Sequence, residues 1–170
     1  METWKAIRSR RNVRQFDGRP IAEDDLDRIL EAGRRAPSAV NRQPWDFVVV
    51  TGRERLGELA KVWRFSHVAD SAATIAIVAE RLEDRRAREL QFFDLGQATM
   101  AMMIAAADLG IGSGHSVVED EERARELLGY PAARFCAFLL PLGYPAGRPL
   151  FPLRSPHRRA FDDVVHRNRW

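Results

Sequence analysis

The sequence predicts a single domain of the mixed α/β class. Three apolar runs, at 46–50, 73–79 and 135–144, are typical of buried strands, and the first is β-branched. Segments with helical periodicity separate these runs. A chain of 170 residues buries roughly 70% of the surface that its unfolded form exposes, which is enough for one core. We therefore expect one domain over residues 1–170.

Helical spacing recurs in the first half of the chain, starting with a short helical lead before residue 10. From Glu23 to about Arg35, apolar residues return every three or four positions over a polar face, which predicts an amphipathic helix. Pro37 ends this helix because it has no backbone N–H to donate. The following stretch PSAVNRQPW should be an ordered loop leading into the first strand. Residues 53–62 are expected to be helical.

The most informative element is a helix from Phe92 to Leu109, which reads FFDLGQATMAMMIAAADL. The charge cluster ERLEDRRARE before it should be a solvated approach to the helix. Apolar side chains occupy nearly every face of the helix, and such a helix must be covered all round. A chain of this size has few elements for that task, so a homodimer with this helix at its centre is the simpler solution. The alternative is that other elements of the same subunit cover this helix.

The second half of the chain completes the pattern. Gly110 is a candidate C-cap of the central helix, and acidic residues open a further helix at about 119–128. The last strand follows this helix. The tail from Pro145 contains three more prolines and is too short for a domain. We expect it to wrap over a surface, either of its own chain or of a partner.

Composition excludes several classes of protein. The longest apolar stretch is about half as long as a membrane-spanning helix, and the N-terminus lacks an apolar region followed by a cleavage site. We therefore expect a cytoplasmic protein without a membrane partner. The single Cys136 excludes an internal disulfide. Together with only four scattered histidines, it offers no ligand set for a metal ion.

Arginine dominates the basic residues, with 25 Arg and two Lys among the 27. Residues 1–19 and residues 148–170 each carry six basic and two acidic residues, a net charge of +4 at each end. The segment between them, 20–147, has a net charge of −5. A solvated surface accounts for this distribution as well as a function does. The functional interpretation is that the two ends meet around an anion, because the planar guanidinium binds phosphate bidentately and keeps its proton.

Two glycine-containing motifs do not match the functions that they suggest. LGIGSGHS is close to a dinucleotide-binding fingerprint, but His115 occupies the last glycine position and the run follows a helix instead of a strand. GHSVV begins like the nucleophile turn of an α/β-hydrolase, but it ends on Val118 where that turn has glycine. The two runs therefore predict neither a dinucleotide-binding turn nor the nucleophile of an α/β-hydrolase.

The N-terminal segment RSRRNVRQF gathers three arginines and an asparagine within five residues. Side chains that fan from the end of the short helical lead can surround a phosphate. Further along the chain come PSAVNRQPWDF, the apolar helix ending in DLGIGS, the strand and turn LLPLGYP, and the tail RRAFDDVVH. In this order, and over nearly its whole length, the chain resembles the nitroreductase family of FMN-dependent oxidoreductases.

The resemblance implies a three-layer α-β-α sandwich with a mixed, largely antiparallel sheet, assembled as an interlocked homodimer. It implies an enzyme, a flavoprotein with FMN as cofactor and NAD(P)H as electron donor. The implied cycle is ping-pong. NAD(P)H transfers a hydride to the flavin and dissociates, and an electron-poor acceptor such as a nitroaromatic or a quinone then binds at the same position. The flavin performs the redox step, while the protein supplies position and electrostatics.

The resemblance also implies which residues bind the cofactor. The basic N-terminal motif matches residues 10–14, with Asn12 where a serine is common, and the flavin-contacting loop of the other subunit matches residues 37–41. The stretch near the redox-active ring nitrogen begins at His115, where many relatives have glycine or another residue with a free backbone amide. A structural hydrogen bond is an equally good role for His115. The expected cofactor-binding residues are Arg10, Arg11, Asn12, Arg14, Pro37, Ser38, Ala39, Asn41, His115, Ser116, Arg158 and Arg159.

The substrate pocket and two alternative functions stay open. The chain is shorter than many relatives, which predicts a smaller or more open pocket, and Phe92, Phe93 and Trp63 line either that pocket or the core. One alternative is a family member that uses reduced flavin for dehalogenation or flavin breakdown, with negligible turnover of NAD(P)H and quinones. The other is a basic nucleic-acid-binding module, whose affinity for DNA would fall steeply with salt. The sequence has no recognition motif for that role, so no nucleic-acid partner is expected.

Overall fold

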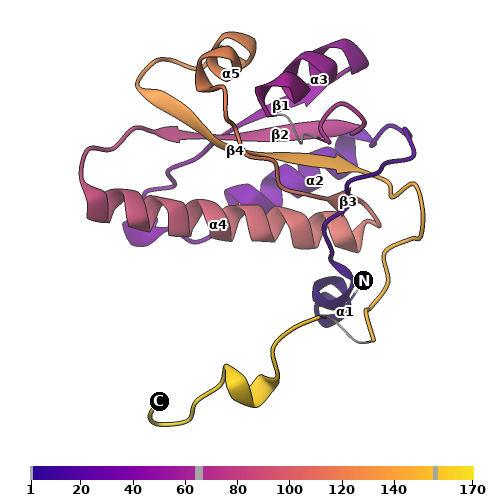
Figure 1. Ribbon diagram of the computed structural model, residues 1–170, viewed down its shortest axis with the longest axis vertical. Helices are drawn as coiled ribbons and strands as arrows, with labels where there is room; N and C mark the ends of the chain where they lie inside the picture. Colours follow the sequence, from indigo (N-terminus) through magenta and orange to yellow (C-terminus); the bar gives the residue numbers. More distant parts are fainter. Residues whose placement is uncertain (1, 64–66, 155–156) are drawn as a thin grey trace.

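The computed structural model describes residues 2–63, 67–154 and 157–170. A four-stranded sheet forms the middle layer, with α2 and α4 on one face and α3 and α5 on the other (Figure 1). The expected three-layer α-β-α sandwich is thereby confirmed. The helices and strands are α1 (Thr3–Ser9), α2 (Glu23–Arg34), β1 (Asp46–Thr51), α3 (Arg53–Leu59), β2 (Ala73–Glu80), α4 (Arg85–Asp108), β3 (Gly112–Ser113), α5 (Glu121–Leu128) and β4 (Arg134–Gly143).

The strand order is β1-β2-β4-β3, and every neighbouring pair is antiparallel. The expected mixed character is confined to one isolated parallel bridge, between Asn12 and Ser113. β2 lies inside the sheet and buries seven of its eight residues, which explains its uninterrupted apolar run. β1 forms an edge of the sheet. The sequence did not predict β3, because its two residues are too few to form an apolar run.

Two apolar clusters fill the spaces between the three layers. Ile29 of α2, Met102 of α4 and Leu140 of β4 belong to the cluster on one face of the sheet. Leu56 of α3 and Ala124 of α5 belong to the cluster on the other face. Burial of a Leu, Ile or Met side chain contributes about 1.5–3 kcal/mol. These clusters therefore fix both helical layers against the sheet.

α4 begins at Arg85, seven residues before the predicted start at Phe92. The charged segment expected to precede the helix forms its first turns instead. The Asp84 carboxylate caps the helix by accepting a hydrogen bond from the Ala87 backbone amide at 2.7 Å, and Arg85 pairs with Glu89 one turn further on. Caps and pairs of this kind stabilise a helix that has no apolar periodicity. They explain why the helix extends into the charged run.

α4 has one covered side and one uncovered side. Ala98, Met102 and Ala106 are fully buried between α2 and the sheet. On the opposite side, the side chains of Leu90, Phe93 and Met100 are exposed, and we term these three residues the α4 stripe. One chain therefore covers only part of this helix. Among the described helices, none is long and apolar enough to cross a membrane.

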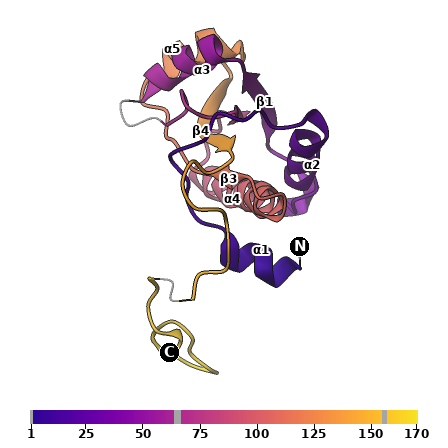
Figure 2. The ribbon, with the colours of Figure 1, turned by 90° about the vertical axis from the view of Figure 1, so that its right-hand side faces the viewer.

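The segments that follow α1 and β4 run side by side between the sheet and α1 (Figures 1 and 2). We term residues 144–154 the C-terminal strap. Its backbone is joined to residues 8–17 by three hydrogen bonds: Asp17 N to Tyr144 O (2.9 Å), Ala146 N to Gln15 O (3.0 Å) and Leu153 N to Arg8 O (3.2 Å). Beyond the strap, the tail of residues 157–170 extends away from the body of the molecule (Figure 2).

Glycines near β3 give the N-terminal segment room to lie against the edge of the sheet. A Cβ atom on Gly112 would lie 2.6 Å from a methyl carbon of Val13, and one on Gly114 would lie 2.8 Å from the Val13 backbone oxygen. The close approach permits the hydrogen bond from Val13 N to Ser113 O at 2.8 Å. The run LGIGSGHS therefore has a packing role, which is why it resembles a dinucleotide motif without matching one.

Gly114→Ala is expected to destabilise the fold by about 1–3 kcal/mol, as overpacking of a filled site does. The new Cβ would lie 2.6 Å from His67 Nε2, in addition to its close approach to Val13. Thermal unfolding followed by circular dichroism measures the effect. Gly57→Ala in α3 is the matched control: nothing lies within 4 Å of its Cβ, so the protein should gain about 0.5–1 kcal/mol. An unchanged melting temperature for Gly114→Ala would contradict the close packing described above.

Candidate functional site

Arg10 and Arg11 leave the N-terminal segment in different directions. The Arg10 guanidinium donates to the side-chain oxygen of Asn12 at 3.2 Å and lies 3.9 Å from the Met103 sulfur of α4. Arg11 donates to two backbone oxygens of the C-terminal strap, at 2.6 and 3.3 Å. Neighbouring side chains of an extended backbone point to opposite sides. The side chains of the basic N-terminal motif therefore contact two different parts of the molecule.

Arginines from both ends of the chain line one cavity of about 480 Å³. We term Arg8, Arg10, Arg154 and Arg158 the terminal arginine cluster. The rest of the wall is apolar and consists of Trp4, Ile7, Met100, Ile104 and Leu153. No carboxylate lines this cavity in the described parts of the chain. The two basic ends of the sequence thus meet at one place.

The terminal arginine cluster holds like charges close together. Burial lowers the pKa of Arg10, and the positive charge of Arg158 lowers it further. Guanidinium groups that face no carboxylate repel one another, so an anion between them relieves an unfavourable interaction. A phosphate monoester suits this arrangement because its oxygens accept bidentate hydrogen bonds from arginine.

Three arginines expected near the phosphate do not line this cavity: Arg11, Arg14 and Arg159. The first two border a second hollow of about 380 Å³ beside the strap. The third donates to the backbone oxygen of Asp163 at 2.6 Å, inside the tail. From the expected phosphate-binding set, the structure places Arg10 and Arg158 in the wall of one cavity. Asn12 accepts a hydrogen bond from Arg10 but lines the second hollow with Arg11 and Arg14.

His115 and Ser116 follow β3 and differ in their surroundings. The His115 ring packs edge-on against Phe138, with centroids 5.9 Å apart. Burial lowers the pKa of His115, and so does the positive charge of Arg10, which links this imidazole to the terminal arginine cluster. Ser116 is buried, and its backbone exchanges hydrogen bonds of 2.9 and 2.8 Å with Leu139. The Ser116 amide is thus committed to the sheet and is not available to a ligand.

The loop of residues 37–43 has an unusual backbone. Val40, Asn41 and Gln43 have φ angles of 45°, 56° and 49°, where a β-branched residue such as valine is an outlier. The Ser38 hydroxyl closes the loop by accepting a hydrogen bond from the Gln43 amide at 2.9 Å. Strain of this kind costs of order 1–3 kcal/mol per residue and persists only where the surroundings enforce it. The Val40 side chain is 85% exposed, so its own chain does not pack against it.

Asp94 of α4 anchors this loop. Its carboxylate accepts a hydrogen bond from the Ala39 backbone amide at 3.1 Å, and only 3% of the residue is exposed. One turn further along the helix, Gln97 donates to the backbone oxygen of Pro37 at 3.4 Å. The sequence analysis did not identify Asp94, although a lone acid in an apolar helix is a usable signal. A buried carboxylate needs a hydrogen-bond donor, and the backbone of a neighbouring loop is a common one.

The loop and the terminal arginine cluster lie at different places along α4. The loop is anchored at Asp94, whereas Arg10 contacts Met103, nine residues further on. Nine helical residues span about 14 Å along the helix axis. One chain therefore holds the two halves of the expected site apart, a geometry that fits the expectation that the loop serves the site of another copy.

The aromatic candidates for the substrate pocket do not line the cavity of the terminal arginine cluster. Phe92 tilts against Phe135 with ring centroids 5.9 Å apart, which is a packing role within the chain. Phe93 belongs to the α4 stripe and is 66% exposed. Trp63 is half-buried and follows the short turn after α3.

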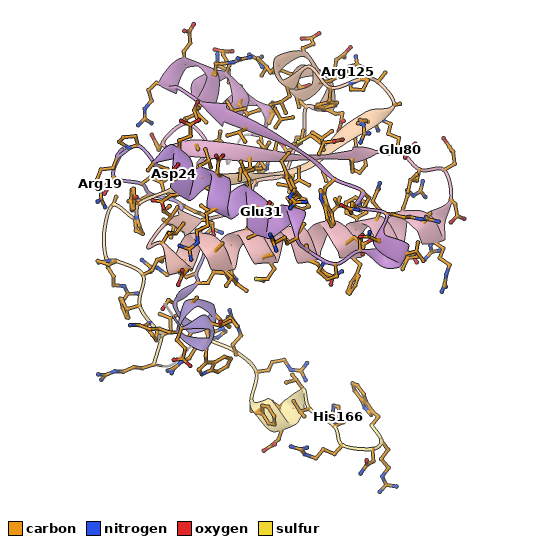
Figure 3. The ribbon with its side chains drawn as sticks, turned by 180° about the vertical axis from the view of Figure 1, so that it is seen from behind. Arg19, Asp24, Glu31, Glu80, Arg125 and His166 are labelled. Carbon is orange, nitrogen blue, oxygen red and sulfur yellow. The ribbon has the colours of Figure 1, made fainter. Side chains whose placement is uncertain are left out.

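Within the described ranges, no group of three or more His, Cys, Asp or Glu residues is placed to hold a metal ion. Figure 3 shows His166 on the tail, far from the sheet and its helices. Cys136 is buried in β4, and burial raises the pKa of its thiol to about 12. The thiol therefore stays protonated at neutral pH and is a packing residue.

Comparisons with known proteins agree over the whole length of the chain. A sequence model of the nitroreductase family matches residues 7–68 and 60–144. A protein of Archaeoglobus fulgidus, provisionally named NADH dehydrogenase/NAD(P)H nitroreductase, is 35% identical over 99% of both chains. The FMN reductase (NAD(P)H) of Bacillus subtilis is 26% identical over 91% of this chain and 70% of its own. The solved structure of an FMN-dependent nitroreductase from Clostridium difficile has a TM-score of 0.82 at 22% identity, covering 97% of this chain and 98% of that one.

Proposed function

Because the chain belongs to the nitroreductase family, we propose that its terminal arginine cluster binds the phosphate of FMN and that a second copy of the chain completes the flavin site. Membership of the family makes the protein an FMN-dependent oxidoreductase with NAD(P)H as electron donor. The observation that carries the proposal is the cavity in which Arg10 and Arg158 meet from opposite ends of the chain.

The residues of this cavity fit the phosphate end of FMN. Four arginines line a cavity whose wall has no carboxylate among the described residues and is otherwise apolar. A phosphate dianion neutralises part of the repulsion that lowers the pKa of Arg10. Arg10 and Arg158 donate charge-assisted hydrogen bonds to the phosphate. Asn12, fixed by its hydrogen bond from Arg10, presents its amide on the same side of the extended segment.

The isoalloxazine end of FMN is assigned to residues of both copies. Arg14 continues the series of Arg10 and Asn12 at alternate positions and is proposed to contact the ribityl chain. His115 packs against Phe138 and is influenced by the positive charge of Arg10, and it is proposed to border the ring. The loop from Pro37 to Asn41 of the second copy approaches from the other side. The Asn41 carboxamide carries both a donor and an acceptor, as the pyrimidine edge of a flavin does.

FMN, when bound, takes up a hydride from NAD(P)H and passes electrons to an acceptor. The residues of this chain bind and orient that group, and the positive charge of the terminal arginine cluster stabilises added negative charge nearby. No side chain is assigned as an acid or a base. The names of the relatives favour an electron-poor aromatic acceptor, so we propose a nitroaromatic compound or a quinone.

A homodimer is proposed because the chain leaves a large apolar surface uncovered. The α4 stripe and the side chains of Trp4 and Ile7 of α1 are all exposed. Contiguous apolar patches on soluble proteins mark interaction sites. Pairing of this surface between two copies would bring the strained loop of one chain toward the arginines of the other, which supports a shared site.

The tail supports interlocking of the two copies. Phe161, Val164 and Trp170 are exposed on a segment that extends away from the body (Figure 2). β1 is an edge strand, and beside it lies a hollow of about 690 Å³ whose apolar wall includes Leu30, Trp45 and Phe47. The exposed apolar side chains of the tail match the apolar part of this wall. We propose that the tail of each copy packs on the other.

The spectrum of the purified full-length protein tests the proposed function. We expect a yellow protein with about one FMN per chain, released on denaturation, that oxidises NAD(P)H when a quinone or nitroaromatic is added. Bound FMN with negligible NAD(P)H turnover would favour the use of reduced flavin for dehalogenation or flavin breakdown. A colourless protein that takes up no added FMN would overturn the proposal, and salt-sensitive DNA binding would then favour the nucleic-acid alternative.

A further inference from the structure

The loop of residues 37–43 is a compact unit held by internal hydrogen bonds. The Asn41 amide donates to the backbone oxygen of Ser38 at 3.0 Å, and the Arg42 amide donates to that of Ala39 at 3.1 Å. Together with the hydroxyl contact that closes the loop, these bonds join residues no more than five positions apart. They therefore fix the shape of the loop, but they do not fix its place on the molecule.

Two side chains of α4 determine where the loop lies. One oxygen of the Asp94 carboxylate accepts the hydrogen bond of the Ala39 amide at 3.1 Å, and the other accepts one from the Gln97 side chain at 3.4 Å. Gln97 also donates to the backbone oxygen of Pro37 at 3.4 Å. We term Asp94 and Gln97 the α4 clamp. Because its two members are bonded to each other, the clamp holds the loop at two backbone positions as one unit.

Burial makes the contact at Asp94 costly to break. The residue is 3% exposed, and a buried carboxylate that loses its donors has a large desolvation penalty. Gln97 is only half-buried, and its partners include a neutral backbone oxygen. Asp94 is therefore the stronger member of the clamp, and its removal should release the loop more fully.

The loop has features of a segment that contacts a ligand. Val40 and Asn41 have positive φ angles, and backbone strain of this kind clusters at ligand-binding sites. Both residues are exposed, so the chain does not use their side chains for packing in its own core. Asn41 lies two positions beyond the amide that Asp94 holds, inside the same closed loop. The place of its carboxamide therefore depends on the α4 clamp.

We infer that the α4 clamp consists of positioning residues for the flavin ring: by holding the loop at Pro37 and Ala39, it places Asn41 at the flavin of the second copy. The inference rests on the proposed function, in which this loop completes the site of the other copy. It gives two residues of α4 a role in cofactor binding that they exercise through the loop.

Two flavins that differ only in the phosphate test this inference on the full-length apoprotein. Asp94→Ala removes both acceptor oxygens of the clamp, and the loop approaches the ring rather than the phosphate. We therefore expect the affinities for FMN and for riboflavin to fall by the same factor, about tenfold. Arg158→Ala should weaken the binding of FMN alone, because riboflavin has no phosphate. Quenching of flavin fluorescence gives the dissociation constants.

A double-mutant cycle shows whether the clamp acts through the loop. Asn41→Ala should weaken flavin binding in the otherwise unaltered protein but have no further effect beside Asp94→Ala, since the loop is then already displaced. Asp94→Asn keeps one acceptor oxygen for the Ala39 amide and should restore part of the affinity. Gln97→Ala removes the weaker member of the clamp and should have a smaller effect. It carries the same test if the Asp94→Ala protein does not fold.

Hydrogen exchange of the apoprotein follows the loop without any flavin. The Ala39 amide is bonded to a buried carboxylate, so residues 37–43 should exchange slowly in the unaltered protein and faster in Asp94→Ala. The matched control is Asp108→Ala, which removes another carboxylate of α4, one that pairs with Arg28 of α2 at 3.0 Å. It should change neither the exchange of the loop nor the affinity for either flavin.

The outcomes separate this inference from the proposed function. Unchanged exchange of the loop in Asp94→Ala would overturn the clamp itself. Faster exchange with unchanged affinity for both flavins would overturn the positioning role, and so would multiplicative effects of Asp94→Ala and Asn41→Ala. If Arg158→Ala leaves FMN affinity unchanged, the proposed phosphate site falls, while an equal loss of both flavins in Asp94→Ala would still support the clamp. An apoprotein that binds neither flavin would overturn both.

Discussion

Arg158→Glu is expected to weaken FMN binding by at least a hundredfold without lowering the melting temperature of the apoprotein. The substitution removes a charge-assisted hydrogen bond, worth about 1.5–3 kcal/mol. It also places a carboxylate near the phosphate, and two like charges about 4 Å apart cost up to about 4 kcal/mol near a protein surface. A total loss of about 3–5 kcal/mol corresponds to a factor of roughly 10²–10³ or more in the dissociation constant.

The apoprotein should tolerate this change because Arg158 is exposed and the new carboxylate faces three arginines of the terminal arginine cluster. Titration with FMN and a thermal melt of the apoprotein measure the two quantities. Arg159→Glu is the matched control, since the Arg159 guanidinium is directed to the backbone oxygen of Asp163 and lies outside the cavity wall. Equal losses of FMN affinity in the two variants would mean that general charge, and not the position of Arg158, governs binding.

Phe93→Glu is expected to convert a dimer into monomers and to abolish retention of FMN. The Phe93 side chain is 66% exposed in the single chain, so the substitution should not disturb the core. Within a dimer interface, however, an unpaired carboxylate would be buried at a cost of several kcal/mol. If two copies complete the flavin site, loss of the dimer removes the loop of residues 37–43 from the flavin.

Light scattering coupled to size-exclusion chromatography gives the mass in solution, and absorbance at the flavin band gives the FMN content of the same peak. Ala132→Glu is the control, because it adds the same charge at an exposed turn between α5 and β4. That variant should remain a yellow dimer. A Phe93→Glu protein that still elutes as a flavin-loaded dimer would exclude the α4 stripe from the interface.

The major elements of the fold could be predicted from the sequence because their apolar patterns are long. The runs at β1, β2 and β4 and the periodic segment of α2 coincide with the observed elements. The predictions differ from the structure where local contacts determine where an element begins or whether it forms. α4 starts seven residues early because Asp84 caps it, and β3 forms because its two residues pair with Gly143 and Leu142 of β4. Neither a cap nor a two-residue strand produces a hydrophobic period.

The charge of the candidate site could be predicted from the sequence, but the directions in which its side chains point were harder to predict. The net charge at each end indicated that the termini meet, and Arg10 and Arg158 do line one cavity. The same reasoning grouped Arg11 with Arg10, because a run of basic residues does not show that alternate side chains face opposite ways. The positive φ of Val40 was also not predictable, and its loop is anchored through a hydrogen bond from Ala39 to Asp94, 55 positions away.

Residues 8–17 are hydrogen-bonded to residues 144–154, so both segments must be synthesised before this part of the fold can form. A ribosome delivers the N-terminal arginines early, but the cavity that they line is incomplete until Arg154 and Arg158 are synthesised. Cofactor loading would therefore be a late event of biogenesis, following translation of the strap, and nascent chains would be colourless.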